Sequence, residues 1–177
     1  MMRRTSSKLV RVSARAGRRA QGWLIADALR CPVALGRSGI RADKREGDGA
    51  TPRGRFRALR VWWRGDRGPR PRTRLPLRRI SRSDAWCEDP EDPRYNQPIR
   101  LSQCSAADRL WRDDGLYDLI VEIDHNTRPR KAHRGSAVFI HVARPGLQPT
   151  AGCVALARAS LRGLLCKLDR KTRILIH

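Results

Sequence analysis

A histidine and a cysteine on either side of a short loop are the side chains of this sequence best suited to covalent catalysis. His141 lies in the apolar run 136–143, and Cys153 follows Gly152 after a segment rich in proline and glycine. Such a loop reverses the chain, so we expect the imidazole and the thiol to face each other. A neighbouring imidazole raises the thiolate fraction and shuttles the thiol proton. The pattern therefore predicts a nucleophile, Cys153, with a base, His141.

The residue before the cysteine favours acyl transfer. Gly152 lets a substrate carbonyl approach the backbone closely, and the N–H of Cys153 with a neighbouring N–H would hold the oxyanion that attack creates. By geometry alone, this arrangement predicts acyl transfer through a thioester. Buried structural cysteines are more common than nucleophiles, so the pair by itself does not decide the function.

Most of the elements that must position this pair are predicted to be strands. Val10 and Val12 alternate with polar residues, which is typical of a half-buried strand. The apolar run 136–143 is typical of a strand covered on both faces. Further strands are predicted at 23–29, 31–36, 56–63 (with Leu59, Val61 and Trp63 on one face), 119–123 and 174–176.

One helix and two long loops complete the predicted fold. Four leucines form one stripe of an amphipathic helix with Ser160 as a candidate N-cap: Leu161, Leu164, Leu165 and Leu168. Glycines and a proline in 41–54 predict a structured loop. Residues 65–82, rich in proline and arginine, are predicted to be exposed and mobile. The fold class is mainly β with one C-terminal helix (α+β), a single domain at 9–177 after a basic tail at 1–8.

The charge of the chain is strongly positive and uneven. The 177 residues include 39 Lys and Arg against 17 Asp and Glu, a formal net charge of +22. Residues 1–82 carry 24 basic and 5 acidic side chains (24 − 5 = +19), and residues 83–177 carry 15 and 12 (15 − 12 = +3). Such a field attracts nucleic acid, anionic cell-wall polymer or a membrane surface. No recognition helix, zinc-finger spacing or aromatic RNA motif accompanies it, so no specific nucleic-acid partner is expected.

The cysteine count and the apolar runs exclude two classes of protein. The five cysteines are odd in number and form no Cys-x-x-Cys, so we expect neither a zinc ribbon nor a thioredoxin-like site. No apolar run approaches about 18 residues, so no transmembrane segment is expected. The first twenty residues have the basic character that begins a secretion signal, but arginines interrupt the apolar centre.

The segment around the cysteine resembles the active-site motif of the L,D-transpeptidase catalytic domain (YkuD-like) family. That family places a histidine, a loop and then Ser/Thr-His-Gly-Cys, and the matching positions here are His141, Thr150, Gly152 and Cys153. Ala151 stands in place of the second family histidine. The gap of twelve residues from His141 to Cys153 is also shorter than is usual in the family. Both departures resemble those of a bacterial branch with the motif Phe-Ile/Leu-His-Val-Ala and Pro-Thr-Ala-Gly-Cys-Val-Ala-Leu.

Two further segments resemble the same branch. Residues 44–56 are similar to the Thr-Pro-x-Gly-x-Phe segment that leads into a core strand of the family, after the Gly-Arg-Ser-Gly of 36–39. Residues 86–96 contain Trp-Cys-Glu-Asp-Pro and Tyr-Asn. The resemblance extends from Leu9 to the C-terminus. It implies a β-sandwich catalytic domain with the active cysteine at one edge.

The resemblance also implies an activity on peptidoglycan stem peptides. Cys153 would attack the carbonyl on the L-centre of a diamino acid and release the terminal D-amino acid, with His141 as the base. The amides of Gly152 and Cys153 would stabilise the oxyanion, and Thr150 would brace the loop or the histidine. An amine of a second stem would resolve the thioester into a cross-link, whereas water would give an L,D-carboxypeptidase. Carbapenem β-lactams are expected covalent ligands, and the implied reaction needs no metal and no organic cofactor. The expected location is periplasmic or cell-wall-facing, with a cytoplasmic location left open.

Several other residues admit two interpretations. Arg134 is a candidate for binding a substrate carboxylate, although we prefer a solvated arginine. His125 and His133 are candidates to replace the missing histidine, but we expect them to be loop or surface residues. Glu46 and Asp48 are expected to pair with nearby arginines (Arg37 and Arg41) rather than to brace the site. The alternative function is a non-catalytic basic binding module for cell wall or nucleic acid.

Overall fold

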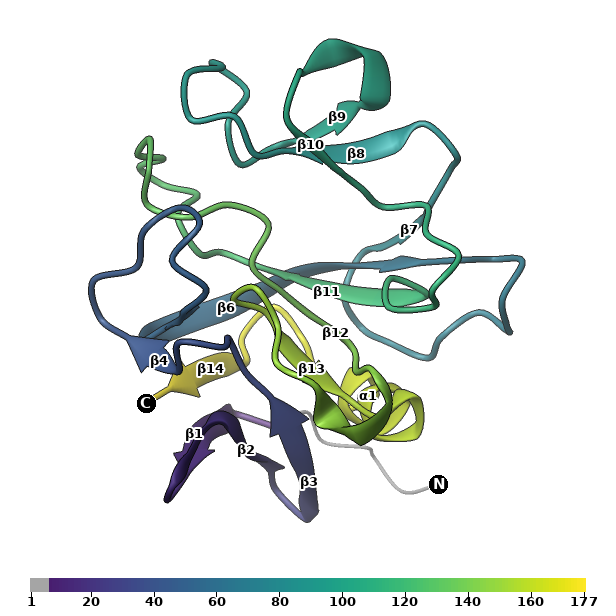
Figure 1. The fold of residues 1–177 in the computed structure, drawn as a ribbon. Helices are drawn as coiled ribbons and strands as arrows, with labels where there is room; N and C mark the ends of the chain where they lie inside the picture. Colours follow the sequence, from purple (N-terminus) through teal and green to yellow (C-terminus); the bar gives the residue numbers. More distant parts are fainter. Residues whose placement is uncertain (1–6) are drawn as a thin grey trace.

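Alternating apolar residues build the first strands of the structure, a computed structural model that describes residues 7–177 (Figure 1). Strand β1 (Leu9–Arg15) buries Val10 and Val12 completely and exposes the arginine between them. It forms an antiparallel hairpin with β2 (Arg18–Ala26), which in turn pairs with β3 (Leu29–Ala34). The predicted strands are thus present, with β2 beginning earlier than expected.

The main sheet closes on itself. Its order is β11-β12-β13-β3-β2-β1-β14-β6-β7, and β11 also pairs with β6, so every strand except β7 belongs to a closed, barrel-like ring. The bounds of its other strands are β6 (Gly54–Trp63), β7 (Leu77–Arg79), β11 (Leu119–Ile123), β12 (Phe139–Val142), β13 (Val154–Leu156) and β14 (Arg173–Ile176). The mainly β class with one helix is confirmed. The expected sandwich is corrected to a closed sheet, because a sandwich would leave β11 and β6 on separate edges.

Strand β6 contains an irregularity that shifts its faces. Ala58 pairs with Ile123 and Arg60 with Glu122, so Leu59 is an extra residue with no partner in β11. Such a bulge changes which side chains point inward. Val61 and Trp63 pack with the main core as expected, but Leu59 does not belong to that core among the described residues.

Helix α1 (Arg158–Leu165) packs its apolar stripe into the closed sheet. Leu161, Leu164, Leu165 and Leu168 are all fully buried, with Leu168 just beyond the end of the helix. Each such leucine stabilises the fold by about 2 kcal/mol through burial. The N-cap residue is Ala157, which makes no side-chain cap, so the expectation of a Ser160 cap is wrong.

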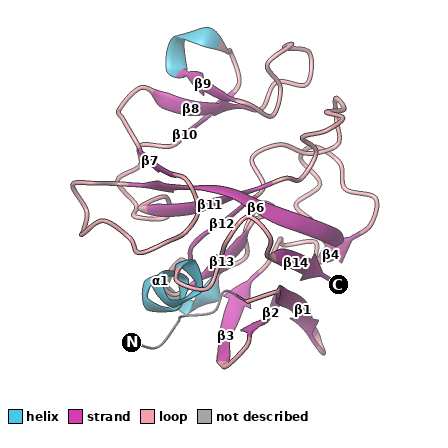
Figure 2. Cartoon of the chain, turned by 180° about the vertical axis from the view of Figure 1, so that it is seen from behind, coloured by secondary structure: helices cyan, strands magenta, loops and turns pink. Residues whose placement is uncertain are grey.

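A second, smaller sheet covers one side of the closed sheet. It consists of β8 (Asp84–Cys87), β9 (Pro98–Arg100) and β10 (Ala107–Arg109), in the order β10-β8-β9, with the short 3-10 helix η1 (Leu101–Gln103). Figures 1 and 2 show it standing clear of β6 and β11, on the opposite side from β1 and β2. A second core, rich in aromatic residues, fills the space between the two sheets: Trp62, Ile80, Trp86, Leu110, Leu116, Tyr117, Ile120, Ala137, Phe139 and Cys153. We call the small sheet the cap.

The arginine- and proline-rich segment at 65–82 is only partly the exposed loop that was predicted. Residues 66–70 are exposed, but Leu75 and Ile80 are buried. Strand β7 within this segment pairs in parallel with β6. The apolar residues between the arginines explain the difference, because they supply one edge of the sheet and part of both cores.

Ser7, the first described residue, is bonded to the segment that follows α1. Residues 1–6 of the predicted basic tail at 1–8 lie outside the described residues. Ser7 is buried, and its N–H donates to the carbonyl of Lys167 at 2.9 Å. All five cysteines are free thiols. In residues 7–177 no helix has the length and apolar character needed to cross a membrane.

Candidate active site

His141 and Cys153 line the same cavity, whose volume is about 340 Å³. His141 lies in β12, and Cys153 immediately precedes β13, its parallel neighbour. The segment between them is therefore a return crossover rather than the simple reversal expected from its prolines and glycines. Its turn contains Gly146 and Leu147 with positive φ angles of 71° and 52°. The crossover places Cys153 beside Phe139 on the neighbouring strand, and Phe139 lies two residues before His141.

The Cys153 thiol is buried and hydrogen-bonded. It is 8% exposed, donates to the carbonyl of Ala137 at 3.2 Å and accepts from the backbone N–H of Phe139 at 3.3 Å. Burial raises the pKa of the Cys153 thiol to about 12, partly offset by the Phe139 N–H, which stabilises the thiolate. The thiol is consequently protonated at neutral pH and needs a base in order to act as a nucleophile.

The imidazole of His141 has the tautomer that a base requires. Its Nδ1 lies 2.8 Å from the carbonyl oxygen of Val142, which can only accept, so Nδ1 carries the hydrogen and Nε2 has the free lone pair. Burial lowers the pKa of His141 to about 4, so the ring is neutral at pH 7. The ring of Tyr117 packs edge-on against it, with centroids 5.3 Å apart. The site therefore rests as a neutral thiol and a neutral imidazole.

Thr150 fixes the backbone before the nucleophile. Its hydroxyl donates to the carbonyl of Cys153 at 2.6 Å and accepts from the N–H of Gly152 at 3.1 Å. Its own N–H donates to the carbonyl of Leu35 at 2.9 Å. The arrangement is that of the loop brace expected for Thr150.

The backbone donors at the nucleophile differ from expectation. The Gly152 N–H is bonded to Thr150, so it is engaged within the loop. The N–H of Cys153 donates to no other group among the described residues. Of the two amides expected to hold an oxyanion, only that of Cys153 is open in this conformation.

Gly152 has a steric reason to be glycine. Its φ is +150°, and a Cβ atom there would lie 2.8 Å from the carbonyl oxygen of Ala50. Ala50 ends the loop 42–50, which lies between the short parallel strands β4 (Ile40–Arg41) and β5 (Thr51–Pro52). The loop thus packs directly on the backbone that presents the nucleophile.

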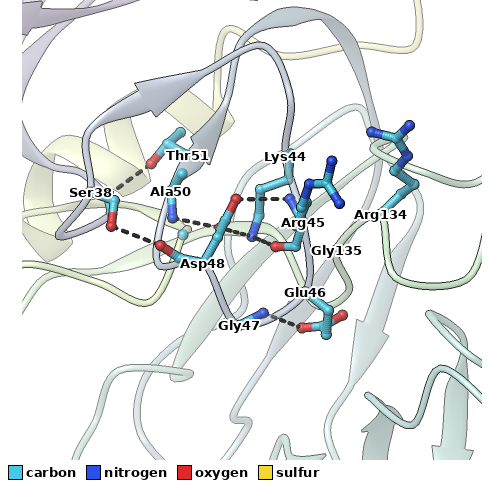
Figure 3. Close-up of polar contacts among 12 residues, drawn as sticks. Ser38, Lys44, Arg45, Glu46, Gly47, Asp48, Ala50, Thr51, Arg134 and Gly135 are labelled. Carbon is cyan, nitrogen blue, oxygen red and sulfur yellow. Dashed lines mark hydrogen bonds and ion pairs between the residues drawn. The ribbon is translucent and has the colours of Figure 1, made fainter.

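Two carboxylates hold this loop in shape (Figure 3). Asp48 accepts from the Lys44 ammonium at 2.6 Å and from the backbone N–H groups of Arg45 and Ala50, both at 2.8 Å. Glu46 accepts from the hydroxyls of Tyr95 and Ser136. The expectation that both acids pair with nearby arginines is therefore wrong. They connect the loop to itself, to the cap and to the segment before β12.

Three other residues considered from the sequence lie outside the cavity. Arg134 is half exposed, forms a 2.6 Å ion pair with Asp43 and stands apart from the Asp48 cluster in Figure 3. His125 contacts the carbonyl of Arg134 at 3.0 Å, and His133 lies 3.1 Å from Glu91 on the surface. None of the three lines the cavity of Cys153. The position of Arg134 agrees with the solvated arginine that we preferred.

The cap packs against the segment that bonds the nucleophile. The Trp86 ring packs edge-on against Phe139, with centroids 4.9 Å apart. Asn96 joins the two, because its Oδ1 accepts from the Trp86 indole at 2.9 Å and from the N–H of Ala137 at 3.1 Å. The Ala137 carbonyl is in turn the partner of the thiol. The chain Trp86–Asn96–Ala137–Cys153 connects the cap to the nucleophile.

Charged residues that were not predicted also line the cavity. Glu88 and Asp108 come from the cap, and Arg112 and Arg144 complete the charged lining. Burial raises the pKa of Glu88 to about 7, with repulsion from Asp108 as a further cause. Burial also raises the pKa of Asp108, which accepts from the Tyr117 hydroxyl at 2.6 Å. Two of these residues could have been found from the sequence. Glu88 lies within the family-like segment 86–96, and Arg144 lies three residues after His141.

Comparison with known families decides the affiliation of the chain. The family model of the L,D-transpeptidase catalytic domain (YkuD) matches residues 7–176. The chain belongs to this family. The match covers the closed sheet, the cap and the cavity alike.

Two solved structures of L,D-transpeptidase 3 from Mycobacterium tuberculosis are also similar to this L,D-transpeptidase domain. The sequence identity is 15% in both cases, with TM-scores of 0.45 for a structure at 1.32 Å resolution and 0.43 for a complex with a faropenem-derived adduct. Each alignment covers 95% of this chain and 60% of the mycobacterial chain, so this chain spans about three fifths of the mycobacterial chain. Comparison with curated proteins gives no significant match.

Proposed function

We propose that this protein is a cysteine-dependent acyltransferase that acts on peptidoglycan stem peptides. The observation that carries the proposal is one cavity lined by a thiol, a neutral imidazole with a free Nε2 and a brace that fixes the backbone at the nucleophile. Membership of the transpeptidase family supports the class of substrate.

In the first half-reaction, Cys153 Sγ attacks the carbonyl on the L-centre of the diamino acid while Nε2 of His141 takes the thiol proton. The carbonyl oxygen becomes an oxyanion that the N–H of Cys153 stabilises. Collapse of this intermediate breaks the C–N bond, and the imidazolium returns its proton to the leaving amine. The products are a thioester on Cys153 and a free D-amino acid.

Arg144 is the residue we propose for the carboxylate of the departing D-amino acid. Its side chain is exposed at the rim of the cavity, and no side chain among residues 7–177 forms an ion pair with it. Arg112 is less suitable, since it already pairs with Asp114 at 2.6 Å and with Asp108 at 3.4 Å. Arg134 is not proposed here, because it lies outside this cavity.

In the second half-reaction, an amine of a second stem attacks the thioester and forms a cross-link, which is L,D-transpeptidation. Water in the same position would release a shortened stem, which is L,D-carboxypeptidase activity. Because its substrate is peptidoglycan, we propose that the enzyme works on the periplasmic or cell-wall side of the membrane. We also propose that carbapenem β-lactams acylate Cys153, since a strained lactam carbonyl presents the same electrophile to the thiol.

Incubation with purified muropeptides, followed by mass analysis, tests the function. A gain of one stem indicates transpeptidation, and loss of a terminal D-alanine with addition of water indicates hydrolysis. Both products should vanish in Cys153→Ser. The matched control is Cys166→Ser, since Cys166 is a half-buried thiol at the end of α1, outside the cavity. Absence of both products with the unchanged protein would refute the proposal.

A further inference from the structure

Glu88 is a carboxylate without a protein partner. It directly follows β8, its backbone N–H donates to the carbonyl of Ala106 at 2.9 Å, and its side chain lines the cavity of Cys153 and His141. All other Asp and Glu side chains in residues 7–177 accept a hydrogen bond or form an ion pair. Glu88 alone, in the described part of the chain, does neither.

This isolation is unexpected in a chain with 39 basic residues and a net charge of +22. A carboxylate taken partly out of water is ordinarily matched by a cation or by N–H donors. Around Glu88 the neighbouring charges are largely of the same sign, because Asp108 and Glu46 both raise its pKa and only Arg112 lowers it. The protein thus places a carboxyl group with no cationic partner in the cavity of the nucleophile. A cationic part of a ligand would supply the missing partner.

We propose that Glu88, assisted by Asp108, binds the protonated amine of the acceptor stem and takes its first proton. The inference rests on the proposed acyl transfer, because it concerns the amine that resolves the thioester. An aliphatic amine with a pKa of about 10 is almost fully protonated at neutral pH and has no lone pair for attack. The acceptor must therefore be bound as a cation and then lose a proton. A carboxylate in the cavity does both, since it attracts the ammonium and accepts a proton from it.

The step balances with the groups on hand. The acceptor R–NH3+ gives one proton to the Glu88 carboxylate and becomes R–NH2. Its nitrogen attacks the thioester carbon, the C–N bond forms and the C–S bond breaks, and His141 carries a second proton from nitrogen to sulfur. The products are an amide, a neutral Cys153 thiol and a protonated Glu88. The pKa of Glu88, about 7, lets it release that proton to water near neutral pH.

Asp108 and Glu88 play different parts in this scheme. Asp108 already accepts from the Tyr117 hydroxyl and pairs with Arg112, so it contributes charge but has less capacity for a new ligand. The other charged or titratable groups that line the cavity are Arg144, His141, Tyr117 and Cys153, and none of them is a carboxylate. Water is uncharged and already has a lone pair, so it does not need a carboxylate to remove a proton before it can approach the thioester, whereas an ammonium does. The carboxylate therefore favours an amine over water as the acceptor.

The experiment measures how the acyl-enzyme divides between two acceptors in one reaction. The donor is a tetrapeptide stem ending in D-alanine, the acceptor is a tripeptide stem with a free diaminopimelate amine, and water competes with it. Glu88→Gln should lower the ratio of cross-linked to hydrolysed product by roughly 10²-fold, the usual range for loss of a general base. Glu88→Asp should recover part of the ratio. The difference between the unchanged protein and Glu88→Gln should grow from about pH 6 to about pH 8, as the carboxyl ionises.

Glu91→Gln is the matched control, because Glu91 lies three residues further along the same connection between β8 and β9 but its exposed side chain faces His133. It should leave the ratio unchanged. Melting temperatures of the three variants show whether each is folded. An equal ratio in Glu88→Gln and the unchanged protein would overturn the inference, as would a loss of donor acylation in Glu88→Gln or transfer to water alone by the unchanged protein. Failure of the proposed function is recognised separately, because the unchanged protein would then show no acyl-enzyme mass.

Discussion

At the scale of single residues, the chemistry depends on the resting charge of the thiol and the imidazole. Cys153 and His141 are both buried, and burial disfavours the charged form of each. The pair therefore differs from a thiolate–imidazolium pair, in which the nucleophile is ionised before substrate arrives. In the proposed mechanism, we therefore expect the proton to move only when the substrate carbonyl is in place.

This resting state makes a prediction about alkylation of Cys153. Because burial raises the pKa of its thiol to about 12, the thiolate fraction should rise about tenfold for each pH unit up to about pH 10. The rate of iodoacetamide modification of Cys153, followed by peptide mass mapping, should rise in parallel without a plateau. A plateau reached below about pH 7 would show a preformed ion pair and contradict this description.

Gly152 allows a test of the backbone that presents the nucleophile. In Gly152→Ala the new Cβ would lie 2.8 Å from the carbonyl oxygen of Ala50, at a φ that side chains rarely adopt. We expect a loss of about 2 kcal/mol in the free energy of unfolding, together with slower acylation by a carbapenem.

The control for this variant is Gly163→Ala in helix α1. No atom lies within 4 Å of the position its Cβ would take, and the backbone there is helical. This substitution should raise the free energy of unfolding by up to about 1 kcal/mol and leave acylation unchanged. Equal stability of the two variants in urea titrations would disprove the proposed clash at Gly152.

At the scale of elements, the cap and the crossover loop hold the nucleophile from two sides. Asn96 is the residue through which the cap acts, because it bonds Trp86, Ala137 and the carbonyls of His125 and Asn126. Asn96→Ala leaves these buried groups without a partner. We expect a loss of about 3 kcal/mol in the free energy of unfolding and faster amide hydrogen exchange across 84–109.

A glutamine elsewhere provides the comparison for Asn96→Ala. Gln21 in β2 accepts one weak, exposed hydrogen bond from Arg18 at 3.4 Å. Gln21→Ala should change the free energy of unfolding by less than about 0.5 kcal/mol. If Asn96→Ala is no more destabilising than Gln21→Ala, the cap is not held by this side chain.

Local patterns in the sequence predicted the elements well where one periodicity dominates. The alternation at Val10 and Val12 predicts β1, and the four-leucine stripe predicts α1. The run 136–143 is buried as expected up to Val142, but β12 begins only at Phe139. The positive φ of Ala137, 49°, interrupts the strand there, and no property of an alanine in an apolar run indicates this.

Local sequence patterns could not predict which distant segments of the chain contact each other. Strand pairing between β1 and β14, or between β6 and β11, joins residues from distant parts of the chain. The position of Glu88 and Asp108 beside Cys153 depends on the cap folding over the closed sheet. The candidate pair itself was predictable, because a histidine, a loop and a cysteine are close along the chain.

At the scale of the whole molecule, the net charge of +22 exceeds what the active site uses. We expect non-specific binding to double-stranded DNA of arbitrary sequence, weakening by roughly 10³-fold or more between about 50 mM and about 200 mM salt. Cys153→Ala should bind with the same affinity, since the cavity takes no part. Fluorescence anisotropy measures both. Binding that is independent of salt, or lost in Cys153→Ala, would contradict a purely electrostatic surface.

The central claim is that Cys153 itself carries the acyl group, and rapid acid quenching tests it most directly. The protein is mixed with a tetrapeptide stem, quenched within the first turnover, digested and mapped by mass spectrometry. We expect the peptide that contains Cys153 to gain the mass of the donor stem minus its terminal D-alanine, in step with free D-alanine. Release of D-alanine without any adduct on Cys153, or with undiminished rate in Cys153→Ser, would contradict the claim.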